Sequence, residues 1–112
     1  MSDIIASREL VAISPDGDRI PVFLRIGRPY QSHTKPDMCS CAVALDPLYP
    51  NLPDQVGSDS FQALWLACGL AINLLRGYKE SGGRILFQDG SNYPLDALAF
   101  AHLNESGPHD NA

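Results

Sequence analysis

Cysteine and histidine side chains lie close together in one part of the chain, where they could bind a metal ion. Cys39 and Cys41 are two residues apart, so on a β-strand they point the same way, and His33 precedes them. Structural zinc usually needs a complete tetrahedral set of ligands, which this group does not supply. Because unpaired cysteines are often buried, we interpret Cys39, Cys41 and Cys68 as core side chains and predict no metal and no cofactor.

Nucleophilic catalysis would require a cysteine or serine beside a histidine and an orienting acid. The histidines His33, His102 and His109 fall in a loop, a terminal segment and a tail, and their spacing brings none of them to a nucleophile. The Gly82-Gly83 pair is typical of a helix stop, because the Gly-x-x-x-x-Gly-Lys pattern of a phosphate loop is missing. With no catalytic motif, the sequence favours a protein that is not an enzyme.

Three arginines form the remaining polar candidate site. Arg8 and Arg25 fall on adjacent predicted strands, where they could share the outer face of a sheet, and Arg28 follows at a strand end. Guanidinium groups bind carboxylates and other anions through paired hydrogen bonds, so this set predicts a small anion-binding patch or a contact for acidic residues such as Asp59. The alternative, which is the commoner arrangement, is a solvated face of a half-exposed sheet.

The elements that would position these residues begin with an antiparallel sheet. Alternating β-branched and apolar residues predict four strands, at Ile4–Ile13, Arg19–Gly27, 38–45 and 84–88. The first two form a hairpin, because Ser14-Pro15-Asp16-Gly17 between them has the chemistry of a tight turn. The third continues the same meander. The proline-rich stretches 28–37 and 46–58 are predicted to be loops without regular structure.

A long apolar helix, predicted over residues 59–78, dominates the pattern. Asp59 followed by Gln62 has the form of a capping box, and the glycine pair at 82–83 stops the helix. Its small-residue face suits packing on the sheet. A neighbouring flank carries Phe61, Trp65 and Ile72, which are too large and apolar to stay in water.

Two coverings of this flank are open. One is the chain's own C-terminal segment, where residues 94–103 predict a short second helix. The other is a protein partner, including a second copy in a homodimer. A ligand pocket against Trp65 is a third option. Three strands, a long helix, a fourth strand and a short helix make an α+β fold, with one domain over residues 1–103 and a disordered tail at 104–112.

Composition narrows the partners. The chain has 112 residues, a net charge of −5 and only 8 lysines and arginines, which argues against nucleic-acid binding. The start has no secretory signal and no stretch is long enough for a membrane span, so we expect a cytoplasmic protein that does not bind membranes. Its odd number of cysteines, 3, predicts reduced thiols.

Several local motifs resemble a family of small bacterial domains of unknown function. The family shares an Arg-x-Leu hairpin, an Ile-Gly-x-Pro motif and an Asp-Ser-x-Gln-Ala-Leu helix start, and the resemblance spans roughly residues 4 to 94. The matching stretches here are Arg8-Glu9-Leu10, Arg25-Ile26-Gly27-Arg28-Pro29, Asp59-Ser60-Phe61-Gln62-Ala63-Leu64 and Tyr93-Pro94. The resemblance implies a bacterial origin and no particular activity.

Two functional hypotheses follow. The first is a cytoplasmic interaction module that buries Phe61, Trp65 and Ile72 against a second copy or another protein. The second is a small-molecule-binding module or enzyme with a cleft between the helix and the strand ends, lined by Trp65 and the arginines. A flat dry contact at the flank supports the first, and a concave pocket with convergent polar groups supports the second.

Overall fold

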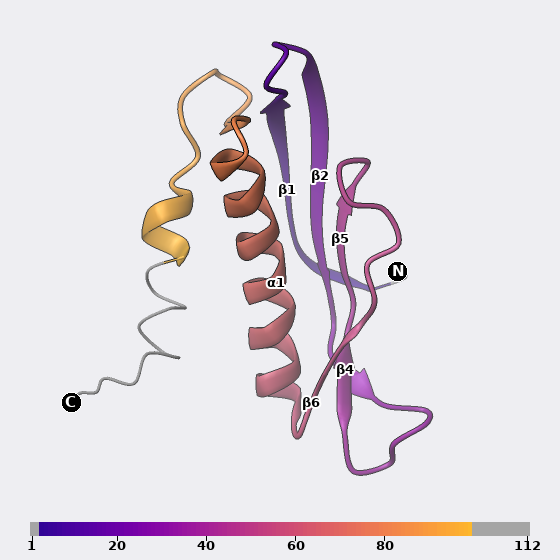
Figure 1. Ribbon diagram of the computed structural model, residues 1–112. Helices are drawn as coiled ribbons and strands as arrows, with labels where there is room; N and C mark the ends of the chain where they lie inside the picture. Colours follow the sequence, from indigo (N-terminus) through magenta and orange to yellow (C-terminus); the bar gives the residue numbers. More distant parts are fainter. Residues whose placement is uncertain (1–2, 100–112) are drawn as a thin grey trace, which may run out of the picture.

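The computed structural model describes residues 3–99 and confirms the predicted α+β class, with strands packed against one long helix. The elements are β1 (Ile4–Ile13), β2 (Arg19–Gly27), β3 (Tyr30–Gln31), β4 (Cys39–Cys41), β5 (Val43–Asp46), β6 (Gln55–Gly57), α1 (Ser60–Glu80) and β7 (Arg84–Leu86). A short helical segment follows at residues 95–99. In Figure 1, α1 lies between this segment and the strands.

The larger sheet has the strand order β5-β2-β1-β7, and every neighbouring pair is antiparallel. The predicted hairpin of β1 and β2 has the bounds expected from the sequence. In its turn the amide of Gly17 donates to the carbonyl of Ser14 at 2.8 Å, with Gly17 at a φ of 94° that other residues rarely adopt. Because this turn sets the register, Ile13 pairs with Arg19 and the following pairs keep that register as far as Ala6 and Ile26, after which a bulge shifts it and Ile4 pairs with Gly27.

The sequence pattern did not predict the second, smaller sheet, which has the order β3-β4-β6. The strand expected at 38–45 is divided at Ala42 into β4 and β5, which belong to different sheets. The carbonyl of Ala42 accepts from the amide of Gly27 at 2.9 Å. Before Ala42, β4 pairs with β6, and after it β5 pairs with β2. Both stretches predicted to be irregular, 28–37 and 46–58, contribute short strands, because pairing across the chain stabilises segments whose own pattern is too brief to detect.

Helix α1 begins where the capping pattern predicts. The Oδ1 atom of Asp59 accepts from the amide of Gln62 at 2.7 Å, and the Oε1 atom of Gln62 accepts from the amide of Ser58 at 2.6 Å, one residue before the cap. Strand β6 approaches this first turn closely, since a Cβ atom on Gly57 would lie 2.6 Å from the amide nitrogen of Ala63. The small sheet is thereby held against the start of the helix.

The core lies between α1 and the larger sheet. Ala63, Ala67 and Ala71 are at most 1% exposed, and their small side chains let the helix approach the strands closely. The sheet contributes large apolar side chains to the same cluster, among them Leu10, Val22 and Leu45. No helix within residues 3–99 is both long enough and apolar enough to cross a membrane.

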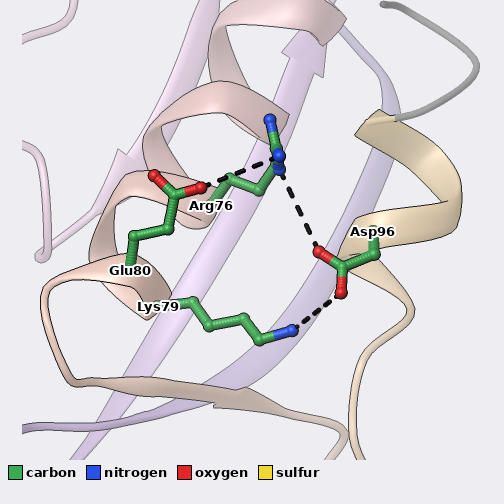
Figure 2. Close-up of polar contacts among 4 residues, drawn as sticks. All are labelled: Arg76, Lys79, Glu80 and Asp96. Atoms are coloured by element: carbon green, nitrogen blue, oxygen red, sulfur yellow. Dashed lines mark hydrogen bonds and ion pairs between the residues drawn. The ribbon is translucent and has the colours of Figure 1, made fainter.

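The C-terminal helical segment, residues 95–99, packs on the second half of α1. Leu95 and Ala99 are each 1% exposed and belong to the core cluster. Figure 2 shows Asp96 between two cations of α1, with 3.1 Å to Nζ of Lys79 and 4.0 Å to Nε of Arg76. Exposed ion pairs contribute little energy each, so the buried leucine carries most of this contact. Residues 100–103 of the predicted helix and the predicted tail at 104–112 lie outside the described residues.

Candidate functional site

The apolar flank of α1 has two halves with different surroundings. At the start of the helix, Phe61 is 73% exposed, and its ring stacks on that of Trp65 with centroids 6.4 Å apart. Trp65 itself is half-buried. Leu66, which the helical pattern did not single out, is 40% exposed in the same two turns, but five residues after Phe61 it faces a different side of the helix. The exposed apolar surface of the flank is therefore concentrated in the first two turns of α1.

The structure buries the third predicted flank residue, Ile72, which is only 7% exposed. Ile72 belongs to the core cluster together with Leu95 and Ala99 of the C-terminal segment. That segment supplies one of the two coverings that the sequence left open, for the second half of the flank. Ile72 is consequently unavailable to a partner while residues 95–99 are packed in place.

A polar cleft of about 750 Å³ lies where the end of β2 meets β5 and the segments that lead into and out of the small sheet. Two of the predicted arginines, Arg25 and Arg28, line it. Trp65 does not, so the cleft is not the one expected between the helix and the strand ends. The remaining lining residues are Asp3, Gly27, Pro29, Tyr30, His33, Ala42, Val43, Ala44, Asp46, Asn51, Leu52 and Asp54.

Each arginine in the cleft has a carboxylate partner. The Nε atom of Arg28 donates to Oδ2 of Asp3 at 2.7 Å, and an Nη atom of Arg25 lies 3.7 Å from Oδ2 of Asp46. The Arg25 guanidinium also lies 5.5 Å from the centre of the Phe23 ring. Any anion that entered the cleft would compete with these carboxylates for the guanidinium groups.

Arg8 does not join the other two arginines. In the hairpin Arg8 pairs with Leu24, whereas Arg25 pairs with Ser7. Paired residues of antiparallel strands point to the same face and successive residues to opposite faces, so Arg8 and Arg25 lie on opposite faces of the sheet. The Arg8 guanidinium instead lies 4.7 Å from the centre of the Phe87 ring. The register that the turn sets could have shown, from the sequence alone, that Arg8 and Arg25 do not share a face of the sheet.

The sequence did not indicate a tyrosine and an aspartate that meet in the cleft wall. The hydroxyl of Tyr30 donates to Oδ2 of Asp54. This hydrogen bond is the main reason that the pKa of Tyr30 is raised, with burial and the charge of Asp54 adding to it. The His33 ring lies 5.6 Å from the Tyr30 ring. A tyrosine with a raised pKa stays protonated near neutral pH and can act as a hydrogen-bond donor.

The cysteines are placed as the core interpretation predicts. Cys41 lies in the core cluster, with Cys39 and Cys68 packed against it. The Sγ atom of Cys41 donates to the carbonyl of Gly27 at 3.2 Å, and burial raises the pKa values of Cys41 and Cys68. Both therefore favour the neutral thiol over the reactive thiolate. Over the described part of the chain, no three His, Cys, Asp or Glu side chains are grouped to hold a metal ion.

Fold and site together define an α+β domain with two candidate binding surfaces, the exposed start of α1 and the polar cleft. No protein-family model, curated protein or solved structure matches the chain. The resemblance to the family of small bacterial domains stays a prediction, and function rests on the chemistry of the two surfaces.

Proposed function

We propose that this chain is a cytoplasmic, bacterial protein-interaction module that binds a partner through the first two turns of α1. The observation that carries the proposal is the 73% exposure of Phe61, a large aromatic side chain on a well-capped helix. Aromatic side chains are enriched at the centres of protein interfaces. Covering Phe61 would contribute roughly 1–2 kcal/mol from its apolar area alone.

The surroundings of Phe61 suit a protein partner better than a small ligand. Phe61 and half-buried Trp65 lie on the convex surface of a helix, and neither of them lines one of the described pockets. Small ligands bind in concave sites that enclose most of their surface. The partner is a second copy of this chain or a different protein. A net charge of −5 disfavours nucleic acid, and the unpaired state of all three cysteines is consistent with a cytoplasmic location.

Site-specific photocrosslinking tests this proposal for both kinds of partner. A photoreactive phenylalanine analogue at position 61 is expected to give a defined covalent adduct in cells of the source organism. The mass of the adduct separates a dimer of this chain from a complex with another protein. The same analogue in place of Asn73, an exposed residue farther along α1, serves as the matched control. Equal labelling at both positions, or no adduct at position 61, would refute the proposal.

A second candidate function is small-molecule binding in the polar cleft. The observation that favours it is the convergence of Arg25, Arg28 and Tyr30 on one cleft of about 750 Å³. A ligand with a carboxylate or phosphate group would accept hydrogen bonds from each of these donors once it had displaced the aspartate that now accepts from it or pairs with it, which is Asp46 for Arg25, Asp3 for Arg28 and Asp54 for Tyr30. Replacing Arg25 and Arg28 together should abolish thermal stabilisation by such a ligand, and binding that survives the double substitution would remove this idea.

A further inference from the structure

Arg25 and Asp46 are neighbours on the outer face of the larger sheet, the face turned away from α1. Strands β2 and β5 pair regularly over four positions, and Arg25 is opposite Ala44. Asp46, two residues beyond Ala44 on β5, is therefore the diagonal neighbour of Arg25 on the same face. The alternate residues of β5, Val43 and Leu45, are buried in the core, so this face points away from it.

The pair of Arg25 and Asp46 has unused hydrogen-bonding groups. An Nη atom of Arg25 lies 3.7 Å from Oδ2 of Asp46, which is too far for a hydrogen bond. Among residues 3–99, neither of these two side chains makes a hydrogen bond, and they are 37% and 46% exposed. The other pair in the cleft differs, because Nε of Arg28 donates to Oδ2 of Asp3 at 2.7 Å. The donors of Arg25 and the acceptors of Asp46 are thus both available to a ligand in the cleft.

The charges that line the cleft disfavour a ligand that is only an anion. Two guanidinium groups, of Arg25 and Arg28, face three carboxylates, of Asp3, Asp46 and Asp54. An anion bound to Arg25 would lie beside the Asp46 carboxylate, and like charges at such short distances repel each other. A ligand that is only a cation would be repelled in the same way by the guanidinium group of Arg25.

A ligand with both charges can bind beside the pair without separating it. In an α-amino acid the ammonium nitrogen and a carboxylate oxygen are about 3 Å apart, because one carbon atom carries both groups. That spacing is close to the 3.7 Å between the nearest charged atoms of Arg25 and Asp46. When the ligand lies antiparallel to the pair, its carboxylate contacts Arg25 and its ammonium group contacts Asp46, so the four charges alternate in sign. Pro29 and Leu52 supply apolar lining for the ligand's side chain.

We propose that the cleft binds a free α-amino acid, with the carboxylate of the ligand on Arg25 and its ammonium group on Asp46. The inference rests on the second candidate function, small-molecule binding in this cleft, and names the class of ligand. The two strands that carry Arg25 and Asp46 fix the spacing of the charges, and the ion pair between them stays in place when the ligand binds.

Three probes with the same apolar side chain test the need for both charges. L-leucine carries both groups, isocaproate lacks the ammonium group, and L-leucinamide lacks the carboxylate. Titrations of the isotope-labelled chain, followed by NMR slightly below neutral pH, should shift the amide signals of cleft residues. The Kd of L-leucine should be lower than the Kd of either other probe by roughly 5-fold or more, because each of them lacks one charged contact.

Asp46→Asn tests the contact of the ammonium group. The substitution removes the charge of the carboxylate and keeps the size of the side chain, so L-leucine should bind roughly 5-fold more weakly. Isocaproate should bind more tightly to this variant, because no carboxylate then repels it beside Arg25. Asp16→Asn makes the same change of charge at an exposed residue of the hairpin turn and should leave both affinities unchanged.

The outcomes separate this inference from the second candidate function. If isocaproate or L-leucinamide binds as tightly as L-leucine, or if Asp46→Asn leaves the Kd of L-leucine unchanged, the amino-acid ligand is wrong while small-molecule binding in the cleft stands. If none of the three probes shifts the amide signals of cleft residues, both the inference and the second candidate function are overturned.

Discussion

Replacing Leu95 by alanine tests whether the C-terminal helical segment is part of the core. Leu95 is 1% exposed and shares the core cluster with Ile72, which this segment helps to bury. Removing its Cγ atom and both Cδ methyl groups loses about 2 kcal/mol of transfer free energy, and the cavity that remains increases the loss to roughly 2–5 kcal/mol. In a domain of this size, such a loss lowers Tm by roughly 10 °C or more.

Leu98 provides a matched control on the same segment. It is 37% exposed, so Leu98→Ala makes the same chemical change with less loss of packing and should cost under about 1 kcal/mol. Urea unfolding followed by the fluorescence of Trp65, the single tryptophan, measures both variants. The slope of the unfolding free energy with urea should stay unchanged if only stability is altered. Equal small losses for the two variants would refute the packing of Leu95 and the covering of Ile72.

Two further predictions concern the backbone of α1 and the cleft. Gly57→Ala should destabilise the fold by roughly 1–3 kcal/mol, because its Cβ would lie 2.6 Å from a helix amide nitrogen. Gly77→Ala, whose Cβ would have nothing within 4 Å, should stabilise the fold by about 0.5–1 kcal/mol. Urea unfolding measures both variants, and a change of the unfolding free energy in the same direction for both would contradict the reasoning. Asp54→Ala should lower the raised pKa of Tyr30, which an alkaline titration followed by NMR measures. The hydrogen bond from Tyr30 to Asp54 stabilises the folded state with Tyr30 protonated. Because the pKa of Tyr30 is higher in the folded state, this stabilisation is present below the pKa of unfolded tyrosine and is lost as pH rises through the folded value. An unchanged pKa of Tyr30 in Asp54→Ala would show that the hydrogen bond does not cause the shift.

Local chemistry determined the parts of the fold that could be predicted from the sequence. The turn at Ser14-Pro15-Asp16-Gly17 joins residues that were already suited to strands, so β1 and β2 have the expected bounds. Asp59 and Gln62 cap α1 through contacts within a few residues. Such interactions depend on near neighbours in the chain, so they can be predicted without knowing the rest of the fold.

Contacts between distant segments decided the remainder. Nothing local divides residues 38–45 between two sheets, because the division depends on Gly27 and on the pairing of β4 with β6. Ile72 and Leu95 belong to one core cluster although they come from separate segments of the chain. The separation of Arg8 from Arg25 depends on the register of the whole hairpin. The sequence therefore determined which side chains were apolar or charged, while tertiary packing decided which of them remained exposed to a partner.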